Sequence, residues 1–479
     1  MSRLEWPAWV SVIGVVGFLG ALSVPLINLS VPPIQIQPEA LTGKTKSFQE
    51  ASLIFQNSCL DCHSAKTRIP WYADLPVART IITQDIMQAQ SLFNMTNKLY
   101  QPGQVPSQNT LAKIEYVTQG GHMPPLKYAA LHWKAVMTDD KKAVIQQWIH
   151  DERAEHYASA ESAEAFKFEP VQPLSSQKNV DKNKVALGFA LYHDTRLSGD
   201  NTVSCATCHD LKKGGTDQLP VSTGIRGQQG PINAPTVYNA VLHSHQFWDG
   251  RAADLKEQAL GPVTNPLEMG GDWAKILPVL NADKEYRKQF NALYGGPASK
   301  EDIADAIAAF EATLITVNSP FDQYLKGDTT ALSDRQKRGY EIFKSIGCVQ
   351  CHTGPALGGN GFERMGVYHD YIADRGHETE VDMGRFNVTQ DPLDKRAFKV
   401  PSLRNVALTF PYFHDGQVET LEDAVSKMSY YQLNHHLSVQ DRDAIVAFLH
   451  SLTGEYNGQS LTPQPDESVE GTENQETHE

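Results

Sequence analysis

The sequence predicts a mainly α-helical chain, in which one transmembrane helix is followed by three helical domains and the last two domains form an internal repeat. Three observations predict this fold. No charged residue occurs between Trp6 and Pro38. A short cysteine–histidine motif occurs three times, and successive copies begin 146 and 143 residues apart. The segments 233–263 and 399–429 repeat each other at a constant offset of 166 residues.

The uncharged N-terminal run is long enough to cross a bilayer. Its apolar part extends from Trp9 to Leu29, and a transmembrane helix requires about 20 apolar residues. A secretory signal has a shorter apolar core of about 7–15 residues and ends in a cleavage site of small residues. No such site follows this run. We therefore expect residues 1–30 to form an uncleaved membrane anchor.

All six cysteines belong to Cys-x-x-Cys-His motifs, the attachment signature of c-type haem. Two thiols bond the porphyrin, and the histidine becomes an iron ligand. The sequence therefore predicts three covalently bound haem c groups in three cytochrome c-like domains. The attaching cysteines are Cys59, Cys62, Cys205, Cys208, Cys348 and Cys351, and the ligating histidines are His63, His209 and His352.

Covalent haem c is assembled outside the bacterial cytoplasm. Together with the anchor, this predicts a single-pass protein of the bacterial inner membrane with its haem domains in the periplasm. The formal net charge of −14 argues against nucleic acid as a partner.

Composition divides the rest of the chain. Pro-rich, polar stretches that we expect to be linkers follow the anchor and recur at 168–179, and the last 21 residues contain six acids and no Lys or Arg. We expect a monohaem cytochrome c domain at 31–165, a second haem domain at 166–325, a third at 326–458 and a disordered acidic tail at 459–479.

The internal repeat differs at one informative position. Asn239 corresponds to Asn405, but Met428 corresponds to Pro262. A methionine thioether is the common second ligand of electron-transfer haems, whereas proline cannot bind iron. We expect Met428 to bind the third haem iron; other candidates are Met365 and Met383.

The sixth iron position of the second haem is then expected to be open. His243 and His245 lie nearby in the sequence, but they correspond to Thr409 and Pro411 of the third domain, which are not ligands there. For the first haem, the adjacent His122 and Met123 are alternatives. The following Pro124-Pro125 is an extended segment that could hold Met123 over the ring.

An open haem can bind a small molecule such as peroxide. Cleavage of peroxide needs a group that moves a proton between its oxygens, and a carboxylate with a raised pKa can do this. Glu268 follows the position of Pro262, and Gln258 precedes it. Glu268 is therefore the candidate proton relay, and Gln258 could orient the peroxide.

Residues 180–458 resemble the bacterial dihaem cytochrome c peroxidases along their whole length. The motifs that carry the resemblance are SCATCH, GPINAPTVYNA, QFWDGRAADLKEQA, NPLEMG, CVQCHTGPALGG, DMGRF, KVPSLRNVALTFPYFHDG and AVSKM–YQLN. The resemblance implies that the second domain carries a peroxidatic haem and the third an electron-transfer haem.

The same resemblance implies roles for individual residues. It implies Met428 as the axial ligand of the third haem, Trp248 as a residue between the two haems, and Gln258 and Glu268 in the peroxide pocket. It also implies a calcium ion, bound by Asn233 and the backbone of Thr409 and Pro411. 

The chain departs from many relatives at Ile225. Those relatives carry a distal histidine there and must be half-reduced before it releases the iron. The switching ligand is therefore missing here.

Residues 59–150 resemble a different family, a small haem-binding domain with the pattern CLDCHSAKTRIPWY…HMPPLKY, and this resemblance favours Met123 over His122. Together, the two resemblances look like the membrane-anchored trihaem peroxidases, some of which take electrons from quinol.

We therefore expect an enzyme that reduces hydrogen peroxide to water with electrons from quinol or from a small cytochrome c or copper protein. The inner membrane and a second copy in a homodimer are further expected partners. One alternative is a dihaem oxidase of the tryptophan-cofactor-forming type, whose second haem has a tyrosine ligand; Tyr430 and Tyr431 lie near Met428. The other is a non-catalytic multihaem electron-transfer protein, against which the open haem argues.

Overall fold

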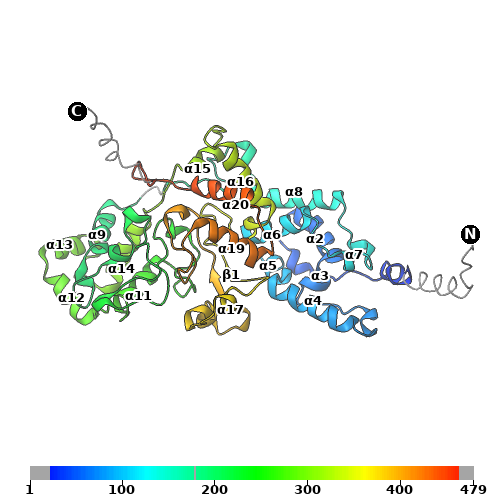
Figure 1. The fold of residues 1–479 in the computed structure, drawn as a ribbon, viewed down its shortest axis with the longest axis horizontal. Helices are drawn as coiled ribbons and strands as arrows, with labels where there is room; N and C mark the ends of the chain where they lie inside the picture. The colour runs from blue at the N-terminus through cyan, green and yellow to red at the C-terminus, as the bar shows by residue number, and fades with distance from the viewer. Residues whose placement is uncertain (1–21, 177–179, 463–479) are drawn as a thin grey trace, which may run out of the picture. The chain divides into compact units, whose positions relative to one another are not determined.

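The computed structural model describes residues 22–176 and 180–462 of the chain. Helices dominate it, so the mainly α-helical part of the predicted fold is confirmed (Figure 1). Within the described residues the chain forms two compact units. One extends to Ala158 and includes Lys167–Pro170, and the other comprises Ser159–Phe166 and the chain from Val171 onward. The bounds of the predicted haem domains stay predictions.

The predicted transmembrane helix is wrong for the part of the chain that the structure describes. No helix within 22–176 or 180–462 is both long enough and apolar enough to cross a membrane. Residues 1–21 of the predicted anchor at 1–30 lie outside the described residues, and the described remainder is shorter than the roughly 20 residues that a span requires. The predicted location, a single pass through the inner membrane with periplasmic haem domains, combined this helix with the assembly of haem c outside the cytoplasm, and it is corrected together with the helix.

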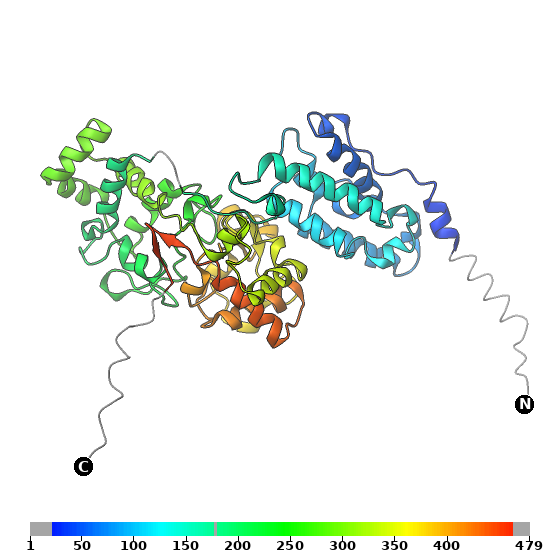
Figure 2. The ribbon, with the colours of Figure 1, turned by 90° about the horizontal axis from the view of Figure 1, so that it is seen from above.

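The first unit is built around an aromatic core. Phe48 and Phe55 on α2 each lie with their ring centroids 5.5 Å from that of Trp148 on α8. Thr45 caps α2 by accepting a hydrogen bond from the Phe48 amide, and α2 leads directly into the first haem motif. The helices α2, α6 and α8 pack together and are seen side by side in Figure 2. The helices of this unit are α2 (Lys46–Ser58), α3 (Leu60–His63), α4 (Ala78–Leu92), α5 (Met95–Leu99), α6 (Gln108–Gln119), α7 (Leu126–Ala129) and α8 (Asp139–His156).

The second unit contains two modules, the first built on helices α9–α14 and the second on helices α15–α20. In each module a helix near its start packs on a helix near its end. The helices of the second unit are α9 (Lys182–Tyr192), α10 (Cys205–Cys208), α11 (Leu255–Thr264), α12 (Trp273–Ala282), α13 (Lys284–Tyr294), α14 (Lys300–Glu311), α15 (Pro320–Leu325), α16 (Asp334–Ser345), α17 (Tyr371–Arg375), α18 (Phe386–Thr389), α19 (Leu421–Leu433) and α20 (Val439–His450). Strands β1 (Phe362–Arg364) and β2 (Ala397–Lys399) pair antiparallel, as do β3 (Glu455–Tyr456) and β4 (Gln459–Ser460).

A glycine lies at the helix crossing of each module. In the first module α9 packs on α14, and a Cβ atom at Gly188 would lie 1.9 Å from the Ala306 carbonyl oxygen. In the second module α16 packs on α20, and a Cβ at Gly339 would lie 1.9 Å from the Ala444 carbonyl oxygen. Both crossings are therefore closer than any side chain would allow.

The two modules meet at one buried hydroxyl. Asn239 and Asn405, which correspond in the repeat, both donate their side-chain amides to the Thr316 Oγ1 at 2.9 Å. All three residues are fully buried. Each asparagine oxygen also accepts a backbone amide, from Thr316 itself and from Gly454. This network fixes one module against the other.

The polar stretch at 168–179 is not an exposed linker in the part that the structure describes. Val171 and Leu174 are buried, and Val171 packs in the core of the second module. Two buried charges hold this segment: Arg404 donates to the Gln172 carbonyl, and Asp322 accepts the Leu174 amide. Arg404 and Asp322 also form an ion pair of 2.9 Å.

Replacement of Thr316 by valine tests the network between the modules. Thr316→Val keeps the shape but leaves two buried amide donors without an acceptor, and each costs about 1–3 kcal/mol. We expect chemical denaturation, followed by circular dichroism, to show a loss of unfolding free energy in this range or above. The exposed Thr329→Val is the control and should change stability by less than about 0.5 kcal/mol. Equal stability of the two variants would contradict the assigned role.

Candidate functional site

The three cysteine–histidine motifs adopt short helical turns. They occupy α3, α10 and the 3₁₀ turn η9 (Cys348–Gln350). All six cysteines are half-buried and free of disulfides. The thiols are therefore available for covalent bonds to a porphyrin.

The histidine of each motif is oriented by a backbone carbonyl. His63 Nδ1 lies 2.8 Å from the Phe93 oxygen, His209 Nδ1 lies 3.4 Å from the Gly215 oxygen, and His352 Nδ1 lies 3.0 Å from the Leu357 oxygen. A carbonyl only accepts, so Nδ1 carries the proton and Nε2 keeps its lone pair.

Burial supports the same protonation state of these rings. It lowers the pKa of all three histidines, that of His352 to about 4, so the rings are neutral at pH 7. A neutral imidazole held through Nδ1 is the usual arrangement of a metal-ligating histidine. The residues of all three motifs thus fit haem c.

The two candidate ligands of the first haem differ in their surroundings. His122 is exposed and stacks on the Tyr116 ring, with centroids 4.8 Å apart. Met123 is half-buried. The imidazole is thus engaged at the surface, and Met123 is the better placed of the two to reach an interior site.

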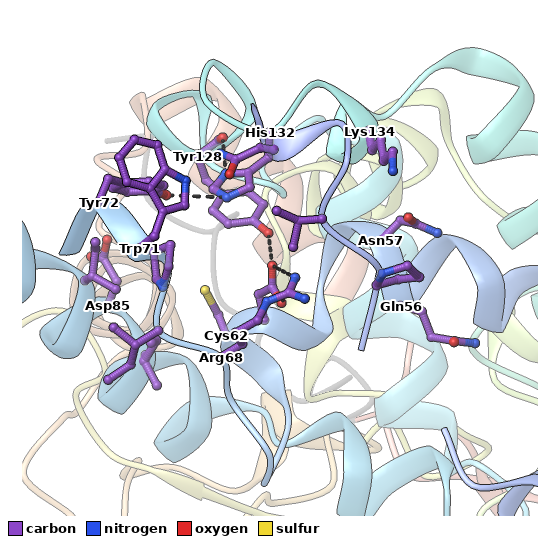
Figure 3. Close-up of a pocket in the computed structure, with 18 residues that line it drawn as sticks. Gln56, Asn57, Cys62, Arg68, Trp71, Tyr72, Asp85, Tyr128, His132 and Lys134 are labelled. Carbon is purple, nitrogen blue, oxygen red and sulfur yellow. Dashed lines mark hydrogen bonds and ion pairs between the residues drawn. The ribbon is translucent and has the colours of Figure 1, made fainter. Parts of the chain in front are cut away.

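A cavity of about 290 Å³ lies beside the first motif (Figure 3). Cys62 lines it, so a haem bonded to Cys62 would reach it. Its polar wall is a hydrogen-bonded chain in which Arg68 and the Tyr128 hydroxyl both donate to Asp61, at 3.1 and 2.6 Å. His132 stacks on the Tyr128 ring with centroids 3.9 Å apart. These residues lie in and just after the motifs CLDCHSAKTRIPWY and HMPPLKY, but no pattern in the sequence predicts that they form one chain.

Glu268 is half-buried in a loop that follows α11. Asn265 donates its side-chain amide to Glu268 Oε1 at 2.7 Å. Burial raises the pKa of Glu268, although the charge of Arg251 and the hydrogen bond from Asn265 act in the opposite direction. The charge of Glu268 also contributes to raising the pKa of the Cys208 thiol, so the carboxylate lies near the second haem motif.

Ile225 and Glu268 are brought together. The Ile225 amide donates to the Glu268 carbonyl at 2.8 Å. The Ile225 side chain is only 3 % exposed and packs in the core of the first module. The backbone at Ile225, where a distal iron ligand would lie in the family, is therefore fixed against the backbone of Glu268.

Gln258 and Trp248 lie on either side of this loop in the sequence. Gln258 is half-buried on α11, and no hydrogen bond joins its side chain to Glu268 among the described residues. Trp248 donates from its indole nitrogen to the Asn233 carbonyl at 2.9 Å. Its ring lies 6.4 Å, between centroids, from both Phe398 and His414 of the second module. Trp248 thus connects the two modules.

Two of the three methionine candidates for the third haem lie in one cluster. Met428 on α19 packs against a buried group that includes Met365 and Phe398, and Trp248 packs against the same group. Met383 ends the turn η10 (Glu380–Met383) and is not part of this cluster. Met428 and Met365 thus lie together, and Met383 lies outside their cluster.

One predicted calcium ligand, Asn233, lies beside the segment that follows the other two. The backbone amide of Asn233 donates to the His414 carbonyl at 2.8 Å. This bond places Asn233 beside the segment that follows Thr409 and Pro411. The Asn233 side chain donates through Nδ2 to the Leu219 carbonyl, so its Oδ1 faces elsewhere. Calcium prefers such amide and carbonyl oxygens.

One acidic residue escaped the sequence analysis. Glu311, at the end of α14, is only 5 % exposed, and burial raises its pKa to about 8. Its charge contributes to raising the pKa of the Cys205 thiol, so it lies near the second haem motif. The signal available in the sequence was a single acid within the apolar run AIAAFEATLI.

Comparison with known proteins matches two family models. Residues 182–330 match the model described as di-haem cytochrome c peroxidase, and residues 21–151 match a haem-binding domain. A crystal structure of a MauG-like protein associated with microbial copper homeostasis is similar in fold, with a TM-score of 0.52 and 30 % identity. That match covers 59 % of this chain and 93 % of the other.

Two curated relatives extend the comparison. The cytochrome c551 peroxidase of Nitrosomonas europaea is 46 % identical over 289 residues, which cover 60 % of this chain and 85 % of the relative. The cytochrome c peroxidase Ccp of Escherichia coli K12 is 48 % identical over 424 residues, which cover 88 % of this chain and 90 % of the relative. With its motifs, its two modules and this extent of identity, the chain belongs to the di-haem cytochrome c peroxidases, a family of haem-dependent enzymes that reduce peroxide.

Proposed function

We propose that this chain is a trihaem peroxidase, which reduces hydrogen peroxide to water at the second haem motif with electrons that pass through the first and third. The observation that carries the proposal is the pairing of Glu268 with Ile225 beside a haem motif for which the repeat offers no second ligand. Haem, when bound, supplies iron that binds peroxide and exchanges electrons.

Three haems are supported by the equivalence of the three motifs. Each has two half-buried cysteines and a histidine whose Nδ1 faces a carbonyl. For the second and third motifs, the carbonyls of Pro235 and Pro401, which correspond in the repeat, act on the same histidines. A shared arrangement in all three motifs supports a shared ligand.

Glu268 is proposed to move the proton. Reduction of one peroxide to two waters consumes two electrons and two protons, and its O–O bond breaks most easily when the leaving oxygen is protonated. The Glu268 carboxylate takes the proton from the peroxide oxygen nearer the iron and returns it to the peroxide oxygen farther from the iron. Asn265 holds Oε1 through its amide, so Oε2 is the oxygen that carries the proton. Gln258, from α11, is proposed to orient the peroxide.

Trp248 and Met428 are proposed to serve electron transfer between the modules. Trp248 contacts residues of both modules, and Met428 belongs to the cluster on which Trp248 packs. We propose Met123 as the corresponding ligand of the first haem. A calcium ion bound by Asn233, Thr409 and Pro411 would hold the segment that supports Trp248.

The tyrosine ligand of the alternative oxidase finds no support. Tyr430 stacks on His369 with centroids 4.1 Å apart, and the Tyr431 hydroxyl donates to Asp374 at 3.2 Å. Tyr431 packs on the cluster that contains Met428, but its hydroxyl is taken up by Asp374, and the Tyr430 ring is taken up by His369, so the peroxidase is the better match to this site.

The electron donor is proposed to be a small cytochrome c, a copper protein or a quinol. Peroxide consumption by the purified protein, measured with each reduced donor in turn, distinguishes them. The homodimer stays a prediction that the mass of the protein in solution tests.

Glu268→Gln tests the proton relay. The amide cannot take a proton, so we expect kcat to fall by about 10²–10⁴-fold with haem content unchanged. The carboxylate is the active form, so wild-type activity should fall as the pH drops through the raised pKa of Glu268, and this acid limb should vanish in the variant. The exposed Glu285→Gln is the control. A wild-type rate in Glu268→Gln would remove Glu268 from the mechanism.

The oxidised protein should contain one high-spin ferric haem and two low-spin ones, because Ile225 cannot bind iron. It should also consume peroxide without prior reduction. Ile225→His should convert the high-spin haem to low-spin and introduce a lag that reduction abolishes, whereas Ile225→Val should do neither. Electron paramagnetic resonance and stopped-flow kinetics measure both effects. Three low-spin haems in the wild type would contradict the open site.

Met428→His tests the ligand of the third haem. Loss of the thioether should lower the midpoint potential of one low-spin haem, since methionine ligation raises the potential. Spectroelectrochemical titration measures this shift. Met365→Leu, in the same cluster, is the matched control; a shift in that variant alone would assign the iron to Met365.

A further inference from the structure

Glu311 is a buried acid that the proposed peroxide chemistry does not use. It ends α14 and is only 5 % exposed. It follows Ala304 and Ile307 at helical spacing, so it faces the same apolar core as these two residues. No hydrogen bond or ion pair reaches its carboxyl among the described residues. Acids are almost never fully buried unless they are paired, so this position is unfavourable for a carboxylate.

The core around Glu311 also holds the second haem motif. The helix α14 packs on α9 (Figure 1), and the ring of Phe310, next to Glu311 in the chain, lies 5.1 Å between centroids from the Tyr192 ring. The Tyr192 hydroxyl donates to the His209 carbonyl at 2.6 Å. Cys205 packs on the same core. Glu311 therefore lies beside the second haem motif and is one residue removed from its histidine.

No positive charge compensates Glu311. The titratable side chains of the helices α9, α10 and α11 are Lys182, Lys184, Tyr192, Cys205, Cys208, Lys256 and Glu257. Two of the three lysines face another acid of α14: Lys184 and Lys256 lie 2.6 and 3.9 Å from Asp305. The third, Lys182, is exposed.

The acids and phenols around Glu311 add no positive charge either. Glu257 accepts the Ala253 amide, and Asp210 and Tyr238 lie beside Tyr192. Burial alone raises the pKa of Glu311, to about 8, so the side chain is the neutral acid at pH 7.

We propose that Glu311 takes up a proton when the second haem accepts an electron and releases this proton when that haem is oxidised again. The extra positive charge of the ferric haem stabilises the Glu311 carboxylate, and loss of that charge on reduction stabilises the acid. The two charges interact more strongly in an apolar core than they would in water. This inference rests on the proposed role of the second haem motif.

The step balances in charge and atoms. One electron from the donor reduces the ferric haem, and one proton from solvent forms the O–H bond of the Glu311 carboxyl. Glu268 differs from it, because Glu268 moves a proton between two peroxide oxygens and ends each turnover as it began. Reduction of peroxide consumes protons as well as electrons. A proton stored at Glu311 with the electron keeps the total charge beside the second haem constant.

Redox titration at a series of pH values tests the proposal in the full-length protein. Linkage is reciprocal, so a haem that changes the proton affinity of Glu311 has a potential that depends on pH. The carboxylate favours the ferric state. We therefore expect the midpoint potential of the high-spin haem in the wild type to fall as the pH rises through the region around 8, and to be constant at lower pH.

Glu311→Gln keeps the shape of the neutral acid but cannot titrate. It should hold the potential at the low-pH value of the wild type at every pH, whereas Glu311→Asp should retain the pH dependence. The matched control Glu301→Gln removes an exposed acid from the start of the same helix and should also retain it.

Redox difference infrared spectroscopy is the second readout. The C=O band of a carboxylic acid should appear on reduction of the wild type and of Glu268→Gln, and should be absent in Glu311→Gln. A purely structural role of Glu311 would not produce this band. The wild type and Glu268→Gln keep the proposal testable if Glu311→Gln does not fold.

A potential that is independent of pH in the wild type would overturn the proposal. So would a pH dependence that Glu311→Gln retains and Glu268→Gln abolishes. Neither measurement uses peroxide. A wild-type protein that fails to reduce peroxide would therefore overturn the proposed function instead.

Discussion

One hydroxyl oxygen holds the two modules of the second unit in register. Thr316 Oγ1 accepts an amide from Asn239 on one side and from Asn405 on the other. A third contact, between the Thr316 amide and the Asn239 oxygen, fixes the threonine itself. Because all of these groups are buried, water cannot replace any lost partner. The contacts of Trp248 with Phe398 and His414 depend on this register, and so does the pairing of Lys399 with His243.

Burial is also the cause that shapes the chemistry of the polar groups. It keeps the histidine rings of the haem motifs neutral, and it raises the pKa of Glu268 in a half-buried loop. In each case a specific hydrogen bond then occupies one atom and leaves another free. The Phe93 carbonyl binds His63 Nδ1 and leaves the lone pair of Nε2 free, and the Asn265 amide binds Oε1 of Glu268 and leaves Oε2 free. The low dielectric sets the charge state, and the local hydrogen bond sets the geometry.

Features that depend on a local motif or on the internal repeat could be predicted from the sequence. The cysteines could be assigned because every one belongs to a haem motif, and the correspondence of Asn239 with Asn405 followed from the repeat. That both asparagines bind Thr316 could not be predicted, since the threonine lies outside both repeated segments. His243 and Lys399 are 156 residues apart and become neighbours only through the tertiary fold.

Two stretches of the chain differ from what their composition predicted. Apolar composition predicted a membrane-spanning helix, but no helix of the described ranges has the required length and hydropathy. The stretch at 168–179 is polar and proline-rich, yet Arg404 and Asp322 draw its described part into the core. The composition of a stretch predicts whether its side chains prefer water when taken singly. It does not predict buried ion pairs and hydrogen bonds, because their partners lie far away in the sequence.

The hydrogen bond between the Ile225 amide and the Glu268 carbonyl has a consequence for how this region opens. Catalytic loops commonly exchange their amide hydrogens with solvent through local fluctuations that leave the core intact. The Ile225 side chain is part of the core of its module, so its amide can be exposed only when that core loosens. Hydrogen exchange of the Ile225 amide should therefore be slow and cooperative, and the Glu268 carbonyl that it binds should be released only when the module interior opens.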